Sequence, residues 1–329
     1  MLATNHPNQD DINLFAKSIE KKTKRLYKNN YKHIIKQAIH ISPAYREFVN
    51  KLLSNSALKI KPYNSAGRCH VIEHGESNNY SKRRKIEIYV NFRDPETFTH
   101  ELGHATDFLF GDVCSFSSHV IVQDGKTLEQ IFKEEFDEKE EELYKEVMEE
   151  YASNVDSNIC KGAYETFVKY LPLYVKLDNT SKTLERMAIH KELYESGFVE
   201  IYYQIIKKKC FEIVEQKYSP IMDALSSKYD ISYHYLRGHS IEYYNLNKEL
   251  LVQEFFANLF KEKVTGNHTR FDSLIKLMPK SFNAFERLFV IIYDHIMNNK
   301  KFNDMTVLVK SYARYEHEFY EEDEEEVDE

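Results

Sequence analysis

Two histidines and a glutamate stand at a spacing that suits metal chemistry within residues 97–107, which read TFTHELGHATD. His100 and His104 are four positions apart, so on a helix they lie one turn apart on the same face and can bind one ion together. Glu101 follows the first histidine and can reach a water molecule beside that ion. This HExxH pattern is typical of catalytic zinc sites, in which a third protein ligand comes from elsewhere in the chain.

The helix that must carry these residues is predicted to begin at Pro95 and to stop near Gly111. Asp94 is a suitable N-cap, and proline suits the first helical position. The apolar residues of this segment share one face, roughly opposite the histidines: Phe98, Leu102, Ala105 and Leu109. A histidine that only fills a core is expected inside the apolar stripe, so the pattern favours ligand histidines.

A rival zinc pattern occurs earlier in the chain, where His70, Glu73 and His74 spell the inverted signature HxxEH. That signature also needs a helix. Here it is confined between Gly67 and Gly75 and has β-branched residues at its centre, so a strand is the better interpretation. Two histidines four apart on a strand do not converge as helical neighbours do, which favours the later motif.

The third ligand has two candidates downstream, each a glutamate with alanine three residues later. Glu149 lies in MEEYASN, and Glu254 lies in VQEFFANLF. Both are expected on helices, and their spacing alone leaves both open.

The composition predicts a globular, mostly helical protein. The 329-residue chain is 42% apolar, with 24 Tyr and 21 Phe, and its 9 Gly and 7 Pro leave few breaks between helices. The formal net charge is −8, and acidic blocks at residues 134–150 and 321–329 argue against a nucleic-acid partner. The four cysteines form no CxxC pair and are expected to be free thiols.

The chain shows neither a charged N-terminal segment with an apolar core behind it nor 18 consecutive apolar residues. We therefore expect no transmembrane segment and no membrane partner. The expected location is the cytoplasm, or a destination reached without a cleaved signal peptide.

Hydrophobic periodicity predicts the elements around the HExxH helix. Residues 11–57 have helical spacing, and two β-rich runs, Cys69–Glu73 and Lys85–Phe92, predict a small antiparallel pair. The second run ends just before the HExxH helix and is expected to be an edge strand, along which an extended substrate can pair. Residues 127–230 predict three or four helices, and the expected breaks are Pro172, Gly197 and Pro220.

Two further helices are predicted near the C-terminal end. One runs from about Lys248 to Lys263 and ends near Gly266, and the other starts near Pro279. The second helix has a continuous apolar stripe: Phe282, Phe285, Leu288, Phe289, Ile292 and Ile296.

At Glu254 the sequence resembles the anthrax lethal factor-like zincins, a family that includes the Pro-Pro endopeptidases. The matching segments are HELGHATDF, IFKEE at 131–135, EFFA at 254–257 and MPKSFNAF at 278–285. The resemblance as a whole covers residues 85–136 and 240–297, about a third of the chain. The resemblance implies one Zn²⁺ per chain held by His100, His104 and Glu254. It favours Glu254 over Glu149, because only Glu254 is followed by the Pro-Lys segment.

The resemblance also implies hydrolysis of a peptide bond in a protein or peptide substrate, with Glu101 as the general base. A tyrosine ahead of the third ligand stabilises the oxyanion in this family. The equivalent spacing falls on Asn247 here, so Tyr244 is the predicted residue, with Tyr243 beside it. Asn258 replaces a family glutamate and is expected to hold a ligand by a hydrogen bond.

Asp107 lies one turn past His104, and two interpretations of it stay open. It either accepts a hydrogen bond that supports the site or is an ordinary surface residue of the helix.

The predicted fold class is α+β and predominantly α-helical, with a zincin-like catalytic domain and a small antiparallel sheet. The predicted parts are an N-terminal helical segment at 1–57, the zincin-like domain at 58–136 and 239–300, a helical insertion at 137–238, and a helix end with an acidic disordered tail at 301–329. The alternative is a catalytically inactive zincin-like binding or effector protein that acts through the insertion. Hydrolysis of a non-peptide amide is also compatible with the motif.

Overall fold

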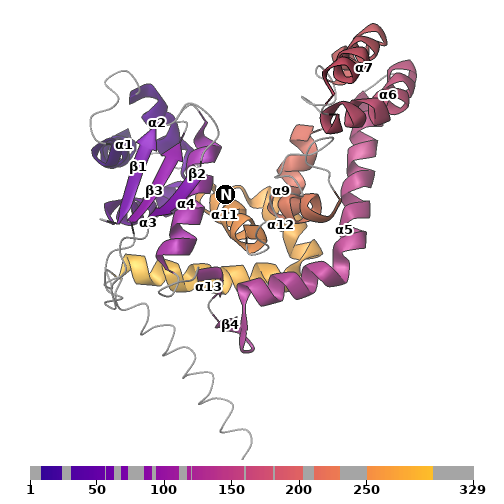
Figure 1. The fold of residues 1–329 in the computed structure, drawn as a ribbon. Helices are drawn as coiled ribbons and strands as arrows, with labels where there is room; N and C mark the ends of the chain where they lie inside the picture. Colours follow the sequence, from indigo (N-terminus) through magenta and orange to yellow (C-terminus); the bar gives the residue numbers. More distant parts are fainter. Residues whose placement is uncertain are drawn as a thin grey trace, which may run out of the picture. The chain divides into compact units, whose positions relative to one another are not determined.

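The computed structural model describes residues 9–23, 31–55, 57–62, 68–72, 85–90, 94–110, 117–119, 121–158, 161–180, 182–202, 211–229 and 250–298. The chain forms two compact units. Unit 1 comprises Met1–Glu135, Val252–Phe271 and Met278–Glu329, and unit 2 comprises Phe136–Leu251 and Asp272–Leu277. The described elements are predominantly helical with a small sheet, as the sequence predicted (Figure 1).

Unit 1 contains the sheet and the HExxH helix. Its elements are α1 (Gln9–Thr23), α2 (Tyr31–His40), η1 (Pro43–Tyr45), α3 (Arg46–Ser54), β1 (Leu58–Pro62), β2 (Arg68–Ile72), β3 (Lys85–Val90), α4 (Pro95–Leu109), η2 (Ser117–His119), β4 (Ile121–Gln123), β5 (Lys126–Thr127), α11 (Leu250–Thr265) and α13 (Pro279–Met297). Two more helices belong partly to each unit: α5 (Leu128–Asn158) and α12 (His268–Leu277). Helix α11 also begins with two residues of unit 2. Helix α12 was not predicted.

The larger sheet has the strand order β1-β3-β2. The predicted antiparallel pair is present, since β2 and β3 pair from Arg68 opposite Tyr89 to Ile72 opposite Lys85. The prediction of a purely antiparallel sheet is wrong, because β1 adds a parallel neighbour on the other side of β3. Strand β3 is therefore central and not the expected edge strand. The backbone N–H and C=O groups of β3 pair with β1 on one side and with β2 on the other, so an extended substrate cannot pair with this strand.

Helix α4 begins where the sequence predicted. The Asp94 side chain accepts hydrogen bonds from the backbone nitrogens of Glu96 at 3.0 Å and Thr97 at 3.5 Å. The helix packs against β3 and β2, and Phe98, Leu102 and Ala105 are fully buried. The predicted apolar face is thus the face that covers the sheet.

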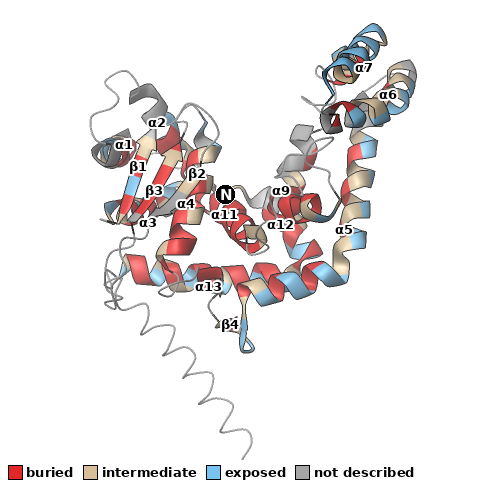
Figure 2. Ribbon diagram, viewed as in Figure 1, coloured by how far each residue is buried: buried red, intermediate tan, exposed pale blue. Residues whose placement is uncertain are grey.

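Helices α11 and α13 also match the predictions. Helix α11 is buried around almost its whole circumference (Figure 2). It ends at Gly266, which has φ of 74°, and the nitrogen of Asn267 donates to the carbonyl of Glu262 at 3.1 Å. All six residues of the predicted α13 stripe are buried.

Glu135 caps the start of α13. Its carboxylate accepts hydrogen bonds from the backbone nitrogens of Lys280 at 3.1 Å and Ser281 at 2.7 Å, and from Ser281 Oγ at 2.6 Å. Two segments that carry the family resemblance, IFKEE and MPKSFNAF, therefore meet through one buried carboxylate.

Unit 2 consists of most of α5 together with α6 (Lys161–Asn179), α7 (Thr183–Glu195), α8 (Phe198–Ile201) and α9 (Phe211–Tyr229). Gly197 is a break, as predicted, and its φ of 75° separates α7 from α8. The prediction that Pro172 and Pro220 are breaks is wrong, because they lie inside α6 and α9. An internal proline removes one backbone hydrogen bond. Buried side chains on both sides of each proline hold these helices in place: Phe167, Leu177, Tyr218 and Ile221.

No helix within the described part of the chain is long and apolar enough to cross a membrane.

Candidate metal centre

His100, His104 and Glu254 come together in unit 1, as the sequence predicted for a metal site. His100 Nε2 lies 3.1 Å from His104 Nε2, and Glu254 Oε2 lies 3.2 Å from His100 Nε2 and 3.4 Å from His104 Nε2. The Glu254 side chain is 6% exposed, against 21% for His100 and 15% for His104. Among the described residues, this group of His, Cys, Asp or Glu side chains is the one arranged to hold an ion.

The three ligand atoms fit one metal ion. A tetrahedral ion with bonds of about 2.0–2.1 Å keeps its ligand atoms about 3.3–3.4 Å apart. The three observed distances, 3.1, 3.2 and 3.4 Å, are close to the edges of one face of that tetrahedron. A two-histidine, one-carboxylate set leaves a fourth position for water or substrate. The group can therefore hold a metal ion of the kind that prefers nitrogen and oxygen ligands.

The approach of α4 to α11 depends on Gly103 and Ala257, which the sequence analysis did not single out. A Cβ atom on Gly103 would lie 2.8 Å from the Cα atom of Ala257 and 2.9 Å from its carbonyl oxygen. Non-bonded heavy atoms do not approach this closely, so only glycine fits. Gly103 lies between the two histidines, and Ala257 lies one turn after Glu254. The close crossing is what brings the carboxylate to the imidazoles.

A polar seam follows the crossing on both helices. We use this name for Glu96, His100, His104 and Asp107 on α4 together with Glu254, Asn258, Lys261 and Thr265 on α11. The spacings are four, four and three residues on α4 and four, three and four on α11, which place each set on one face of its helix. Two contacts join the sets: the triad itself and an ion pair of 3.9 Å from Lys261 Nζ to Glu96 Oε2.

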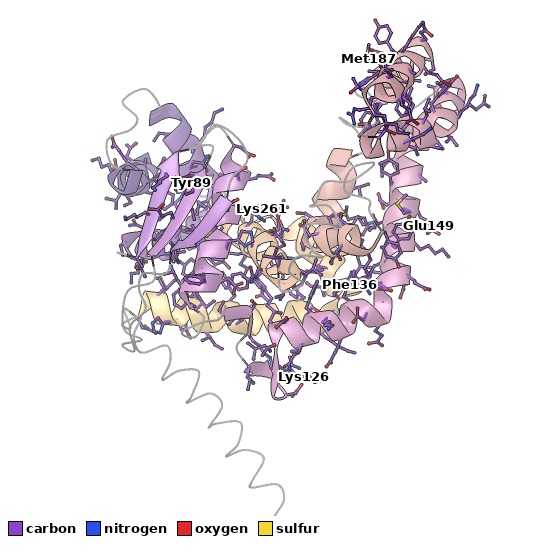
Figure 3. The ribbon with its side chains drawn as sticks, in the orientation of Figure 1. Tyr89, Lys126, Phe136, Glu149, Met187 and Lys261 are labelled. Carbon is purple, nitrogen blue, oxygen red and sulfur yellow. The ribbon has the colours of Figure 1, made fainter. Side chains whose placement is uncertain are left out.

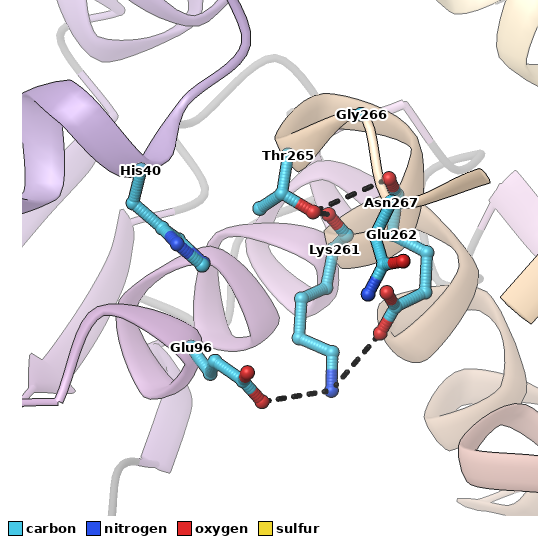
Figure 4. Close-up of a pocket in the computed structure, with 7 residues that line it drawn as sticks. All are labelled: His40, Glu96, Lys261, Glu262, Thr265, Gly266 and Asn267. Carbon is cyan, nitrogen blue, oxygen red and sulfur yellow. Dashed lines mark hydrogen bonds and ion pairs between the residues drawn. The ribbon is translucent and has the colours of Figure 1, made fainter. Parts of the chain in front are cut away.

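A small polar pocket lies at the Lys261 end of the seam (Figure 4). Lys261 Nζ stands between the carboxylates of Glu96 and Glu262, and its ion pair with Glu262 Oε1 measures 3.4 Å. His40, Thr265, Gly266 and Asn267 complete the lining. Lys261 is only 7% exposed, so its ammonium group is compensated by the two carboxylates. This ion pairing holds the end of α11 to the start of α4.

The electrostatics of the triad favour positive charge. Burial alone lowers the pKa of His104, but the Glu254 carboxylate, with help from Glu101 and Asp107, overrides burial and raises that pKa to about 9. A cationic species at this position is therefore stabilised by three carboxylates. The same three carboxylates that stabilise a proton on His104 would also stabilise a bound metal cation.

Glu101 is buried with 5% exposure, and its charge acts on Cys69 in strand β2. Burial raises the pKa of the Cys69 thiol, and the charges of Glu101 and Asp107 raise it further. Cys69 is a free cysteine, as predicted, and its raised pKa keeps the thiol protonated and weakly nucleophilic. The other three cysteines lie outside the described residues.

Asp107 is not a surface residue. It is completely buried, and it accepts hydrogen bonds from Ser117 Oγ at 2.7 Å, the Ser118 backbone nitrogen at 2.7 Å and Ser118 Oγ at 3.0 Å. Of the two interpretations of its position, the surface one is therefore wrong. Asp107 fastens η2 to the metal-bearing face of α4.

The other site residues considered in the sequence analysis have different outcomes in the structure. Glu149, the rival third ligand, has a side chain that is 69% exposed and pairs with Lys145 on α5 in unit 2 (Figure 3). His70 lies in strand β2, as expected for the rival HxxEH stretch, while Glu73 and His74 lie outside the described residues. Asn258 is buried one turn after Glu254. Tyr243 and Tyr244 lie outside the described residues, so the oxyanion role of Tyr244 stays a prediction.

No known protein family, curated protein or solved structure matches this chain. The resemblance to the lethal factor-like zincins therefore rests on the motifs in the sequence.

Proposed function

We propose that this protein is a zinc-dependent metalloendopeptidase with a zincin-like catalytic domain. The observation that carries the proposal is the convergence of His100, His104 and Glu254 at mutual distances of 3.1–3.4 Å. The glutamate that directly follows His100 supports it further, because HExxH sites use that residue for proton transfer. The resemblance of the segments IFKEE and MPKSFNAF to the lethal factor-like zincins adds to this support.

Each residue has a distinct task in the proposed reaction. His100, His104 and Glu254 hold the ion. A bound zinc ion supplies Lewis acidity, which polarises the scissile carbonyl group and makes a water molecule acidic near neutral pH. The Glu101 carboxylate accepts the proton of the attacking water and delivers it to the nitrogen of the departing amine. Tyr244 is proposed to donate a hydrogen bond to the carbonyl oxygen as negative charge develops there.

The sheet offers an extended peptide a pairing partner other than the strand first expected. Strand β2 lies at the end of the order β1-β3-β2 and packs against α4. A substrate strand that pairs with the outer side of β2 would lie next to the helix that carries the histidines. We therefore propose that an extended substrate pairs with β2 and not with β3.

Zinc content per chain tests the proposal. We expect close to one zinc ion in purified wild-type protein, loss of that ion in Glu254→Ala, and its retention in Glu149→Ala. Glu149 is the matched control, because it is also a helical glutamate with alanine three residues later but is exposed and paired with Lys145. A peptide library then identifies the cleaved bond.

Two outcomes would count against the proposal in different ways. Wild-type protein without zinc after preparation in zinc-containing buffer would remove the metal site. Stoichiometric zinc with no hydrolysis across a peptide library would favour the alternative function, a zincin-like protein that binds partners through unit 2.

A further inference from the structure

Asp107 is a buried carboxylate with an unusual set of neighbours. It is completely buried on the same face of α4 as the two histidines, one turn beyond His104. Its three hydrogen-bond donors are a backbone nitrogen and two serine hydroxyls, and all three are uncharged. No lysine or arginine forms an ion pair with it among the described residues. Burial raises the pKa of the Asp107 carboxyl, while the Ser117 and Ser118 hydrogen bonds and the neighbouring His104 act against that shift.

A buried carboxylate of this kind is costly unless positive charge lies nearby. Removing a carboxylate from water is unfavourable, and neutral hydrogen bonds offset that penalty only in part. The three donors fix the position of the Asp107 oxygens and help to keep the group ionised. The three ligand atoms converge at His104, on the same face of α4, so a cation bound there would compensate the buried charge of Asp107.

We propose that Asp107 is a positioning residue of the metal centre, a fixed anion that strengthens cation binding at His100, His104 and Glu254 without touching the ion. The inference rests on the proposed metal site, but it concerns ion affinity and not peptide hydrolysis. Residues that support metal ligands from outside typically change metal affinity by about 10-fold to 100-fold when they are replaced. Asp107 should fall in this range because its charge is shielded from solvent.

The chain provides a matched control in Glu135. Its carboxylate is 1% exposed and also accepts three hydrogen bonds, two from backbone nitrogens and one from a serine hydroxyl. It caps α13, and it is not part of the triad. Asp107→Asn and Glu135→Gln therefore each remove one buried charge with three hydrogen-bond donors, the first on the histidine face of α4 and the second at the start of α13.

The experiment measures the Zn²⁺ dissociation constant of metal-free protein by competition with a chromophoric chelator. We expect Asp107→Asn to weaken binding by about 10-fold or more, and Glu135→Gln to leave the affinity of the folded protein unchanged. Co²⁺ provides a second readout, because its visible spectrum reports the ligand set directly. The Co²⁺ spectrum of Asp107→Asn should keep the wild-type band positions, since the three ligands remain.

Three results would overturn the inference or separate it from the metal site. Equal Zn²⁺ affinity in wild type and Asp107→Asn, with lower thermal stability in the variant, would make Asp107 a purely structural residue. If Asp107→Asn does not fold, Asp107→Ser removes the same charge with a smaller side chain, and unchanged affinity in that variant would overturn the inference as well. Failure of wild-type protein to bind Zn²⁺ or Co²⁺ at all would instead remove the metal site itself.

Discussion

Gly103 on α4 and Ala257 on α11 meet so closely that a methyl group on Gly103 would lie 2.8 Å from the Cα atom of Ala257. The contact joins two motifs that lie 154 positions apart in the chain, at residues 103 and 257. It explains why the variable position before His104 is occupied by glycine. It also makes the metal centre dependent on a backbone contact and not only on its three ligands.

Gly103→Ala should therefore destabilise unit 1 and weaken metal binding. Alanine is better than glycine inside a helix by about 0.8–1 kcal/mol, but forcing an extra carbon into a packed contact costs typically about 1–3 kcal/mol. The clash is with backbone atoms, which cannot turn aside as a side chain can, so we expect a net loss. Urea denaturation of metal-free protein and Zn²⁺ titration measure the two effects.

A second substitution sharpens this test. Because the nearest atoms are the Cα and carbonyl oxygen of Ala257, Ala257→Gly in the Gly103→Ala background removes a methyl group without removing the clash. We expect no rescue. Restored stability and affinity in the double variant would show that the side chain of Ala257, and not its backbone, sets the distance between the helices.

Glu101→Gln should abolish hydrolysis and preserve the metal. A positioned general base or acid contributes typically about 10²-fold to 10⁴-fold, and an amide cannot accept the proton. Zinc content should stay near one ion per chain, because Glu101 is not among the three ligand groups. Glu134→Gln is the control, since Glu134 is a carboxylate of unit 1 that is 60% exposed and pairs with Lys126 at the surface. Peptide cleavage by Glu101→Gln at the wild-type rate would assign proton transfer to another group.

The metal-free protein should lose stability as the solution becomes alkaline. The pKa of His104 is raised from 6.5 to about 9 in the folded protein, where Glu254 overrides burial. A raised folded-state pKa contributes stability that is fully present below about pH 6.5 and is lost as pH rises through about 9. Denaturation of chelator-treated protein at pH 7 and pH 9.5 measures the difference.

His104→Gln should remove most of this pH dependence, whereas His190→Gln, at an exposed position of α7, should leave it unchanged.

The affinity for zinc should rise with pH, whereas the stability of the metal-free protein falls. Since the proton on His104 must leave before the ion binds, affinity should rise with pH up to about 9. An affinity that is flat between pH 7 and pH 9 would mean that His104 is already deprotonated in the metal-free protein.

Glu135→Ala should lower the free energy of unfolding of unit 1 by about 1.5–3 kcal/mol, the range for a hydrogen bond to a charged group. The variant leaves the start of α13 without its cap, so Ser281, which is completely buried, loses an acceptor. Glu134→Ala is the control next to it in sequence, because Glu134 is 60% exposed and pairs only at the surface with Lys126. Similar losses in the two variants, measured by urea denaturation, would contradict this account.

Local signals predicted much of the site-bearing part of unit 1. Asp94 and Pro95 marked the start of α4, and Gly266 marked the end of α11, because caps and glycine turns act over a few residues. The histidine face followed from helix periodicity. These features need no knowledge of distant partners, and the structure bears them out.

Features that depend on distant partners were missed or mistaken. The parallel pairing of β1 with β3 joins Leu58 to Ile86, and no pattern in either strand specifies its neighbour, so β3 was taken for an edge. Pro172 and Pro220 looked like breaks because the packing that holds α6 and α9 is tertiary. Spacing alone left Glu149 and Glu254 open as the third ligand, because it does not reveal the Gly103–Ala257 crossing. The family resemblance, and not a local pattern, favoured Glu254.

The order of the ligands along the chain has a consequence for biosynthesis. His100 and His104 leave the ribosome first, and Glu254 follows 150 residues after His104. At a synthesis rate of about 5–20 residues per second, the histidine pair waits roughly 8–30 s for its carboxylate. Throughout that interval the nascent chain has two of its three ligands. The complete centre, and any hydrolysis that depends on it, arises only after α11 has been made and has docked at Gly103.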